Sequence, residues 1–399
     1  MPPVAVETVA DLLDGRAGLR LRAGWGYVSV LLGGGHICDL TSNRNPAINP
    51  LWRPIWTTTD PGQYHPERHH STYGPPPDGR LLAGIAGHSI SFDHFGPPSL
   101  EEAAAGLSTH GEAPVSRWQL ERQFDDGIEY DATLPIAQID FHRNLRLDPH
   151  RPVIYCEETA KNLSAADRPI CWNQHVTVGP PFLECGVTLV DMPATHAQVI
   201  DASYSDEMLL APDAAFKWPL APAPSGATHN LRTTPDGHYS RYTVQLLDPS
   251  QEVAWTAIAN PVQQCLLLYV FRRADFPWVG NWEERFHRTY VPWGGKTFCR
   301  GIEFSTTPWA IPKRDTISAG PVFNERTWRW LPAQSRRSVR YITALLTIPP
   351  DFAGVEHLSV ESGSLEIHEW RTGERSTGRT LAQPADTSFL VSPHAHPLD

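Results

Sequence analysis

The sequence predicts an all-β protein, and three observations support that prediction. The 38 prolines and 29 glycines amount to about one residue in six of 399, which is too many chain breaks for a helical protein. Strand-like segments recur from Trp118 onward, first SRWQLERQF, GIEYDATLPI, IDFHRNLRL and VIYCEETAKNL, and later VTLVD, YTVQLLD, CLLLYVFRR and YITALLTIP. Hydrophobic residues make up 41% of the chain, enough for a large core. This spacing is typical of a large antiparallel sandwich or barrel.

The first part of the chain predicts a few other local structures. Residues 7–14, ETVADLLD, predict a short N-terminal helix that ends at Gly15. Residues 43–80 are rich in Pro, His, Trp and Tyr without clear periodicity, so we expect a long ordered loop or lid there. Residues 98–107, PSLEEAAAGL, predict a helical turn or two inside another loop.

The domain organisation is expected to be simple. The sequence contains no internal repeat and no low-complexity linker, and the Ala/Pro-rich segment 219–227 fits an exposed loop. The segment HLSVESGSLEIHEW has Ser-Gly at its centre and predicts a hairpin at the start of a C-terminal region of about 355–399. We therefore expect one domain over residues 1–399.

Composition excludes several functional classes. The net charge of −11 argues against a nucleic-acid partner, because binding to phosphates needs a basic face. No segment approaches the ~18 apolar residues of a membrane span. The N-terminus lacks the basic start and apolar run of a secretory signal. The six cysteines have no C-x-x-C spacing, so they are expected to be reduced thiols of a cytoplasmic protein.

Glu303 is the carboxylate whose sequence context most suggests chemistry. It stands between Ile302 and Phe304 in the segment CRGIEFSTTPWAIP, where the proline at 308 ends a strand-like run. Apolar neighbours remove water from a carboxyl group and raise its pKa toward the range useful for a general base. The alternative is a solvated residue on the outer face of a strand.

Two further segments place histidines beside other polar groups. LSTHGEAPVSRW carries His110 and Glu112, and the glycine after His110 would let a ligand approach the backbone. CWNQHVTVGPPFL carries Asn173 and His175, which share one face if the segment is a strand. A surface histidine at 110 and a hydrogen-bonded core histidine at 175 are the competing interpretations.

The segment YHPERHHSTYG supports a metal site as an alternative. His65 and His69 have the i, i+4 spacing of a helical metal pair, and His70 adjoins them. The other interpretation is an aromatic-rich loop whose histidines form hydrogen bonds. His88, like His94, is a possible ligand contact in AGHSISFDHFG. No Walker A, G-x-S-x-G, H-E-x-x-H or G-x-G-x-x-G pattern occurs in a strand–turn–helix setting.

Three of these segments together resemble the aldose 1-epimerase, or galactose mutarotase-like, superfamily. His110-Gly111 precedes Trp118, as a His-Gly precedes a Trp in that family. AKNLSAADRPICWNQH then supplies an Asn-Leu, a proline and a histidine-bearing strand, and GIEFSTTP supplies Glu303 and a proline. These elements follow the family's order, over roughly residues 20–350. The resemblance implies a β-supersandwich of large antiparallel sheets whose concave face binds sugar, with a few short helices in loops.

The resemblance also implies roles. Glu303 would be the general base, His175 the general acid on the opposite side of the sugar, and His110 a residue that positions or polarises the sugar. Such a pair needs no metal, nucleotide or other cofactor. Further sugar contacts are expected among the residues near these three, which are Asn173, His88, Glu112, Trp172 and Trp309, with Trp293 as another ring that could stack on a sugar.

The chain also departs from the family pattern. The segment LAGIAGHSISF offers no arginine where the family carries an Asn-Arg that contacts sugar hydroxyls, and the family's substrate-binding aspartate has no clear counterpart. The resemblance therefore leaves the sugar open. Two functions are expected: an anomer-interconverting isomerase acting on a mono- or oligosaccharide, or a non-catalytic carbohydrate-binding protein of the same fold.

Overall fold

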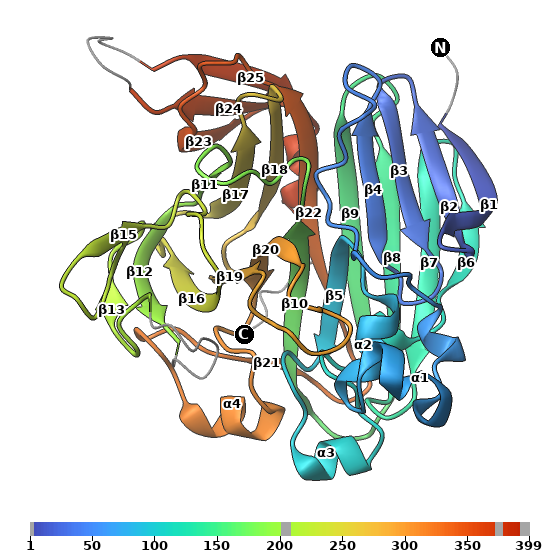
Figure 1. The fold of residues 1–399 in the computed structure, drawn as a ribbon. Coiled ribbons are helices and arrows are strands. Elements are labelled where there is room, and N and C mark those ends of the chain that lie inside the picture. The colour runs from blue at the N-terminus through green and yellow to red at the C-terminus, as the bar shows by residue number, and fades with distance from the viewer. Residues whose placement is uncertain (1–3, 201–208, 372–377, 392–399) are drawn as a thin grey trace.

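The computed structural model of the chain describes residues 4–200, 209–371 and 378–391, and it confirms an all-β architecture with few short helices (Figure 1). The larger sheet has 12 strands, and its hydrogen-bonded neighbours pair antiparallel. In spatial order its strands are β1 (Ala5–Leu13), β2 (Arg16–Ala23), β3 (Gly26–Leu31), β4 (Ile37–Ser42), β5 (His88–Asp93), β10 (Arg168–Val178), β20 (Phe298–Ser305), β19 (Trp278–Arg285), β16 (Tyr239–Leu247), β12 (Ala194–Val199) and β13 (Ala215–Phe216), with β21 (Arg329–Leu331) paired to β10.

The second sheet has eight strands and covers one face of the first. In spatial order they are β11 (Leu189–Asp191), β17 (Val253–Asn260), β18 (Cys265–Arg272), β22 (Arg336–Thr347), β9 (Val153–Asn162), β8 (Ile139–Leu147), β7 (Gly127–Leu134) and β6 (Gln119–Gln123). Two small sheets complete the strands: β14 (Leu220–Pro222) with β15 (Thr228–Asn230), and β23 (Val355–Glu361) with β24 (Ser364–Glu369) and β25 (Thr380–Pro384).

Short helices occupy the connections. They are α1 (Pro66–Tyr73), α2 (Asp78–Gly84), α3 (Leu100–Ala104) and α4 (Lys313–Ala319), with 3₁₀ turns at Pro61–Gln63, Ala113–Val115 and Thr387–Leu390. None of the helices in these described segments is long and apolar enough to cross a membrane. Residues 43–80 are therefore only in part the loop that the sequence predicts, because α1 and the start of α2 fall within them.

Strand alternation places the core between the two large sheets. Trp172 and Val176 of β10 point toward the second sheet, and Ile302 and Phe304 of β20 do the same. The residues between them in the sequence point to the other face of the large sheet. A second apolar cluster joins the outer face of the eight-stranded sheet to the β23–β25 sheet.

The ends of the chain give one wrong prediction and one confirmed one. Residues 7–14 do not form a helix: β1 runs from Ala5 to Leu13 and pairs with β2. The Asp14-Gly15 turn, with φ of 53° and 79°, is the two-residue connection that a hairpin favours, and strand pairing outweighs local helix propensity. At the other end, β23 and β24 form the predicted hairpin around Ser362-Gly363. All six cysteines are unpaired.

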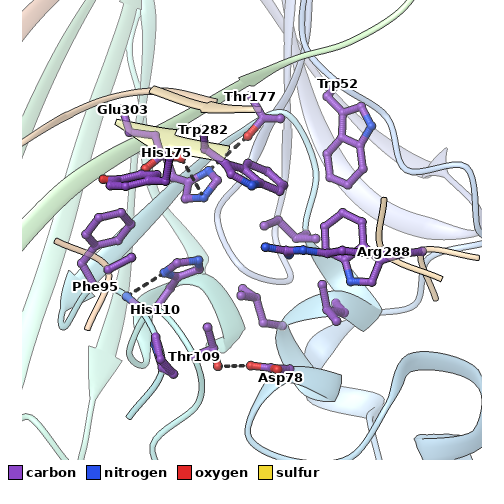
Figure 2. Close-up of a pocket in the computed structure, with 18 of the residues that line it drawn as sticks. Trp52, Asp78, Phe95, Thr109, His110, His175, Thr177, Trp282, Arg288 and Glu303 are labelled. Carbon is purple, nitrogen blue, oxygen red and sulfur yellow. Dashed lines mark hydrogen bonds and ion pairs between the residues drawn. The ribbon is translucent and has the colours of Figure 1, made fainter. Parts of the chain in front are cut away.

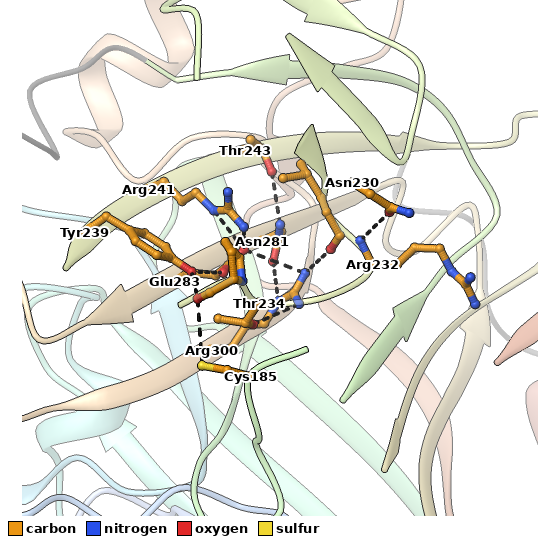
Figure 3. Close-up of polar contacts among 12 residues, drawn as sticks. Cys185, Asn230, Arg232, Thr234, Tyr239, Arg241, Thr243, Asn281, Glu283 and Arg300 are labelled. Carbon is orange, nitrogen blue, oxygen red and sulfur yellow. Dashed lines mark hydrogen bonds and ion pairs between the residues drawn. The ribbon is translucent and has the colours of Figure 1, made fainter. Parts of the chain in front are cut away.

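A buried ionic network joins β20, the neighbour of β10, to β19 and β16 (Figure 3). Glu283 of β19 accepts hydrogen bonds from Arg241 at 2.7 and 3.0 Å, and Arg300 of β20 donates to Asn281 at 2.9 Å. Arg300 lies on the core side of β20, on the face opposite to Glu303. Its charge is therefore directed toward Glu283 and away from Glu303.

Candidate active site

A pocket of about 240 Å³ lies on the face of the large sheet that points away from the second sheet (Figure 2). Strands β10, β16, β19 and β20 and helix α2 contribute to it. Its lining consists of Trp52, Asp78, Leu81, Leu82, Ile85, Phe95, Gly96, Pro97, Thr109, His110, His175, Thr177, Tyr242, Trp282, Arg288, Tyr290, Trp293, Glu303 and Ala310. The three residues expected to carry chemistry, Glu303, His175 and His110, all line this one pocket.

His175 and Glu303 are direct partners across neighbouring strands. Residue 175 of β10 is in register with residue 303 of β20, and both side chains extend to the same face. The Nε2 atom of His175 lies 3.4 Å from Oε1 of Glu303. The sequence-based expectation of a carboxylate and an imidazole on opposite sides of a sugar is therefore wrong, because the two groups stand side by side.

Burial controls the protonation of Glu303. Only 1% of the residue is exposed, and Oε2 has no hydrogen-bond partner among the described residues. No arginine or lysine of the described chain forms an ion pair with it. Loss of hydration raises the pKa of this carboxyl group from 4.5 to about 8. Gly301 makes room for it, because a Cβ built at residue 301 would overlap Oε1 of Glu303.

Burial lowers the pKa of His175, whereas it raises that of Glu303, because in both residues it favours the neutral form. The pKa of the ring falls from 6.5 to about 4. Nδ1 lies 3.1 Å from the hydroxyl of Thr177, which points to the same face two residues along β10. At neutral pH the pair is therefore a protonated carboxyl group beside a neutral imidazole.

His110 enters the pocket from a loop with an uncommon backbone conformation. Its φ is 67°, and its ring stacks on Phe95 with centroids 5.3 Å apart and meets His175 edge-on at 5.0 Å. The backbone N–H of Gly96 donates to Nδ1 of His110 at 3.1 Å. Burial and the nearby His175, His94 and Arg288 hold the pKa of His110 well below its usual value. A neutral ring whose Nδ1 accepts a hydrogen bond carries its proton on Nε2.

Aromatic rings and one guanidinium group form one side of the pocket. The Arg288 guanidinium lies 5.1 Å from the ring centroid of Trp282 and 4.9 Å from that of Trp293, and these two rings meet edge to face. Trp52 stacks on Trp293 at 6.3 Å with 11° between the planes. Nε of Arg288 lies 3.3 Å from the carboxylate of Glu284. Figure 2 shows that Arg288 enters from the side opposite Phe95 and His110.

Two of the residues expected to bind substrate lie on the core side of the large sheet. Trp172 is fully buried against Phe92 and Phe141, and its Nε1 donates to Glu158 at 2.8 Å. His88 pairs with Gln174 at 2.9 Å, and burial lowers the pKa of His88 to about 3. Neither lines the pocket, because each follows the strand alternation that turns it toward the second sheet.

The other expected contacts also lie outside the pocket lining. Glu112 accepts the backbone N–H groups of residues 136 and 137, which ties two loops together. Asn173 shares the face of His175 but is fully buried against Ser91. Trp309 is half-buried and only its neighbour Ala310 reaches the pocket. Buried His94 is also absent from the lining, whereas Trp293 belongs to it.

The histidine-rich segment does not form the alternative metal site. His65 precedes α1, and its backbone N–H donates to Nδ1 of His69, while Nδ1 of His70 lies 3.0 Å from the carbonyl oxygen of Pro66. Within the described residues, no group of three or more His, Cys, Asp or Glu side chains is arranged to hold a metal ion.

Sequence reasoning missed most of the pocket walls. Thr177 could have been found by strand alternation from His175. Trp282 belongs to β19 and Arg288 to the loop after it, and no motif marks either residue. Helix α2 carries its apolar residues within a Pro/Gly-rich segment, where a seven-residue helix gives too short a periodic signal.

Comparisons with known proteins agree with this architecture. A scan against protein-family models finds no match, and a search of curated proteins finds none either. Among solved structures, a candidate aldose 1-epimerase from Klebsiella pneumoniae is similar with a TM-score of 0.60 and 12% identity, covering 87% of this chain and 88% of that one. A galactose mutarotase-like protein from Clostridium acetobutylicum is similar with a TM-score of 0.57 and 13% identity, covering 87% of this chain and 99% of that one.

A candidate aldose 1-epimerase from Escherichia coli K12 gives a TM-score of 0.53 at 11% identity, covering 86% of this chain and 100% of that one. At such low identities the likeness concerns the path of the backbone and the order of the sheets, and leaves the chemistry to be argued from the pocket. The expected architecture is confirmed: this chain has the galactose mutarotase-like fold.

Proposed function

We propose that the protein is a carbohydrate isomerase of the aldose 1-epimerase type, which interconverts the two anomers of a sugar. The observation that carries this proposal is the buried pair of Glu303 and His175, 3.4 Å apart in a pocket, with one carboxyl oxygen free of any described partner. The likeness of the fold to candidate aldose 1-epimerases supports a sugar as the ligand.

The position of the pair suits the chemistry of ring opening. The anomeric hydroxyl and the ring oxygen are bonded to the same carbon, so two catalytic groups that stand side by side can reach both. The distance of 3.4 Å is longer than a strong hydrogen bond, as catalytic contacts often are before a substrate binds.

The protonation states of Glu303 and His175 indicate which residue donates and which accepts a proton first. Glu303 holds a proton below pH about 8 and His175 is neutral above pH about 4. In opening, Glu303 gives its proton to the ring oxygen as His175 takes the proton of the anomeric hydroxyl, and the C1–O bond of the ring breaks. The pair is then a carboxylate beside an imidazolium, and rotation about C1–C2 followed by the reverse transfers closes the other anomer. These roles reverse the base and acid that the family resemblance implies.

His110 is the third residue of the proposed site and acts as a hydrogen-bond donor held in one orientation. Its Nε2–H is the group available to the ligand because Nδ1 is held by the backbone of Gly96. A donor placed beside the pair can polarise the oxygen that gains negative charge as the ring opens. The low pKa keeps His110 neutral, so it does not compete for the proton that Glu303 and His175 share.

Anomer equilibration, followed by polarimetry or NMR on a panel of aldoses, tests this proposal. We expect the wild-type protein to exceed the spontaneous rate for at least one sugar, and Glu303→Gln to lose roughly 10²–10⁴-fold of that acceleration. Asp275→Asn is the matched control, because burial raises the pKa of Asp275 to about 6 in a position outside the pocket. Equal acceleration by wild type and Glu303→Gln would contradict the proposal.

A non-catalytic carbohydrate-binding role is the second candidate, and the aromatic side of the pocket favours it. Trp52, Trp282 and Trp293 line the pocket, and aromatic side chains can contact the C–H groups of a sugar without any chemistry. This role predicts that sugars bind while the wild type and Glu303→Gln both leave the spontaneous rate unchanged.

A further inference from the structure

Part of the pocket wall, formed by two residues of α2 and the residue that follows it, is aliphatic. Leu81, Leu82 and Ile85 line it, and each is less than one-tenth exposed. These three side chains carry no polar atom that could pair with a hydroxyl group. They pack in one cluster with Trp52 and Trp293, so the apolar surface continues into the aromatic side.

The backbone of α2 does not compensate for this lack of polar side chains. The carbonyl oxygen of Leu81 accepts the N–H of Ile85 at 2.8 Å, and that of Leu82 accepts Nε1 of Trp56 at 2.9 Å. The carbonyl oxygen of Gly84 accepts from Arg16 at 2.7 Å. These acceptors are therefore already paired before a ligand enters.

Helix α2, which carries Leu81 and Leu82, begins on the side of the pocket opposite the acid/base pair (Figure 2). In Figure 2, Asp78, the first residue of α2, stands opposite Glu303 and His175. Asp78 itself is exposed and accepts a hydrogen bond from Thr109, so it ends the aliphatic part of the wall with a carboxylate, which offers acceptors and no donor. In a pyranose the edge opposite C1 and the ring oxygen is the C3–C4 edge. A sugar with C1 at the pair thus turns C3 and C4 toward α2.

Resting on the proposed function, we propose that the substrate is a sugar whose C3–C4 edge is apolar, that is, a 3- or 4-deoxy sugar or one whose hydroxyl there is capped by an alkyl group. A free hydroxyl pressed against Leu81, Leu82 and Ile85 loses its water without gaining a partner. Such an unpaired buried hydroxyl lowers affinity by about ten-fold or more. An alkyl group at the same place contacts aliphatic carbon and is favoured by its burial.

The test compares D-glucose with 2-deoxy-, 3-deoxy-, 4-deoxy- and 3-O-methyl-D-glucose. For each sugar, kcat/KM for anomer exchange is measured, and binding is followed separately by intrinsic fluorescence, since Trp52, Trp282 and Trp293 line the pocket. We expect at least one of the 3- or 4-modified sugars to exceed glucose by about ten-fold or more in both measurements. 2-Deoxyglucose serves as the control, because its modified carbon lies away from α2, and it should show no such gain.

Two variants test the wall itself. Ile85→Thr and Leu82→Asn each add a polar group to it, and both should shift the preference back toward glucose, whereas Leu120→Asn, on the exposed β6, should not. Two variants are used so that loss of folding in one leaves the other informative.

The outcomes separate this inference from the proposed function. Glucose handled as well as every 3- and 4-modified sugar would overturn the inference and leave the isomerase proposal standing. Preferential binding of a modified sugar without any acceleration would overturn the isomerase proposal and support the inference for a binding protein. Failure of all five sugars to bind would overturn both.

Discussion

His175 and Glu303 occupy facing positions on β10 and β20, with Nε2 and Oε1 3.4 Å apart, and the strand register alone brings them together. The backbone ladder therefore fixes the pair on rigid elements, and no loop has to close to form it. Burial favours the neutral state of both groups, so at neutral pH the carboxyl group of Glu303 keeps its proton and the ring of His175 is uncharged.

The pH dependence of anomer exchange is the first prediction. We expect kcat/KM to be level between pH about 4 and about 8, to fall above this range as Glu303 loses its proton, and to fall below it as His175 gains one. The measurement is the catalysed rate minus the spontaneous rate across buffers in which the protein stays folded. A rate that climbs as the pH passes 8 would show that the ionised carboxylate starts the reaction.

Glu303 should also make stability depend on pH. Its pKa in the folded protein, about 8, lies above the ordinary 4.5, so the folded state binds the proton more tightly and the free energy of unfolding falls as the pH rises from about 4.5 to 8. Glu303→Gln removes this dependence. Urea unfolding at pH 5 and pH 9 should show the variant gaining on the wild type at the higher pH, by at most about 5 kcal/mol.

The control for this measurement is a substitution of the neighbouring residue. His175→Gln keeps Glu303 and should retain the loss of stability at high pH. A pH-independent difference between wild type and Glu303→Gln would mean that Glu303 titrates as an ordinary carboxyl group, contrary to its burial.

Thr177 is expected to position His175. Its hydroxyl, 3.1 Å from Nδ1, holds the ring with Nε2 toward Glu303. Thr177→Val should lower kcat by about ten-fold with little change in KM, because the ring loses the partner that sets its tautomer and orientation. Thr177→Ser should restore most of the rate, and Thr256→Val, a buried threonine on β17 outside the pocket, should have no effect on it. A serine variant as slow as the valine variant would argue against this role.

Arg288 is expected to act in binding. Its guanidinium lies close to the rings of both Trp282 and Trp293, whose planes are nearly perpendicular, and the compact ammonium group of lysine does not reproduce these two contacts. Arg288→Lys should therefore raise KM by about ten-fold while kcat changes little. Arg122→Lys is the matched control, since Arg122 also stacks on an aromatic ring, at 4.4 Å from the centroid of Phe124, outside the pocket. A fall in kcat at unchanged KM would assign Arg288 to the chemical step.

Periodicity explains which parts of the fold and site the sequence could predict. Strand alternation correctly places Asn173 and His175 on one face, and the same rule, applied to the even-numbered Trp172, puts it in the core. The Asp14-Gly15 dipeptide carried a hairpin signal that the apolar spacing of residues 7–14 obscured.

The approach of distant segments could not be predicted in the same way. Helix α2 and the loop after β19 pack against each other at the pocket, and neither segment has a sequence motif that predicts this contact. The side-by-side arrangement of His175 and Glu303 depends on the register of β10 with β20, which hydrophobic pattern alone does not determine for two largely buried strands.

The last prediction concerns the buried ion pair that supports β10 from the core side. Arg143 and Glu158 are fully buried 2.7 Å apart, and Glu158 also accepts hydrogen bonds from Trp172 and Gln174, the neighbours of Asn173 on β10. Arg143→Met leaves Glu158 as an uncompensated buried charge and should cost about 3–5 kcal/mol of unfolding free energy.

Adding Glu158→Gln to Arg143→Met should recover part of this loss, because glutamine carries no charge and its oxygen can still accept from Trp172. The exposed pair of Arg122 and Glu129, 2.9 Å apart, is the control, and Arg122→Met should change stability by less than about 1 kcal/mol. Urea unfolding of the four proteins measures these differences. A double variant less stable than Arg143→Met would show that the hydrogen bonds of Glu158 to β10, more than its charge, hold this part of the core together.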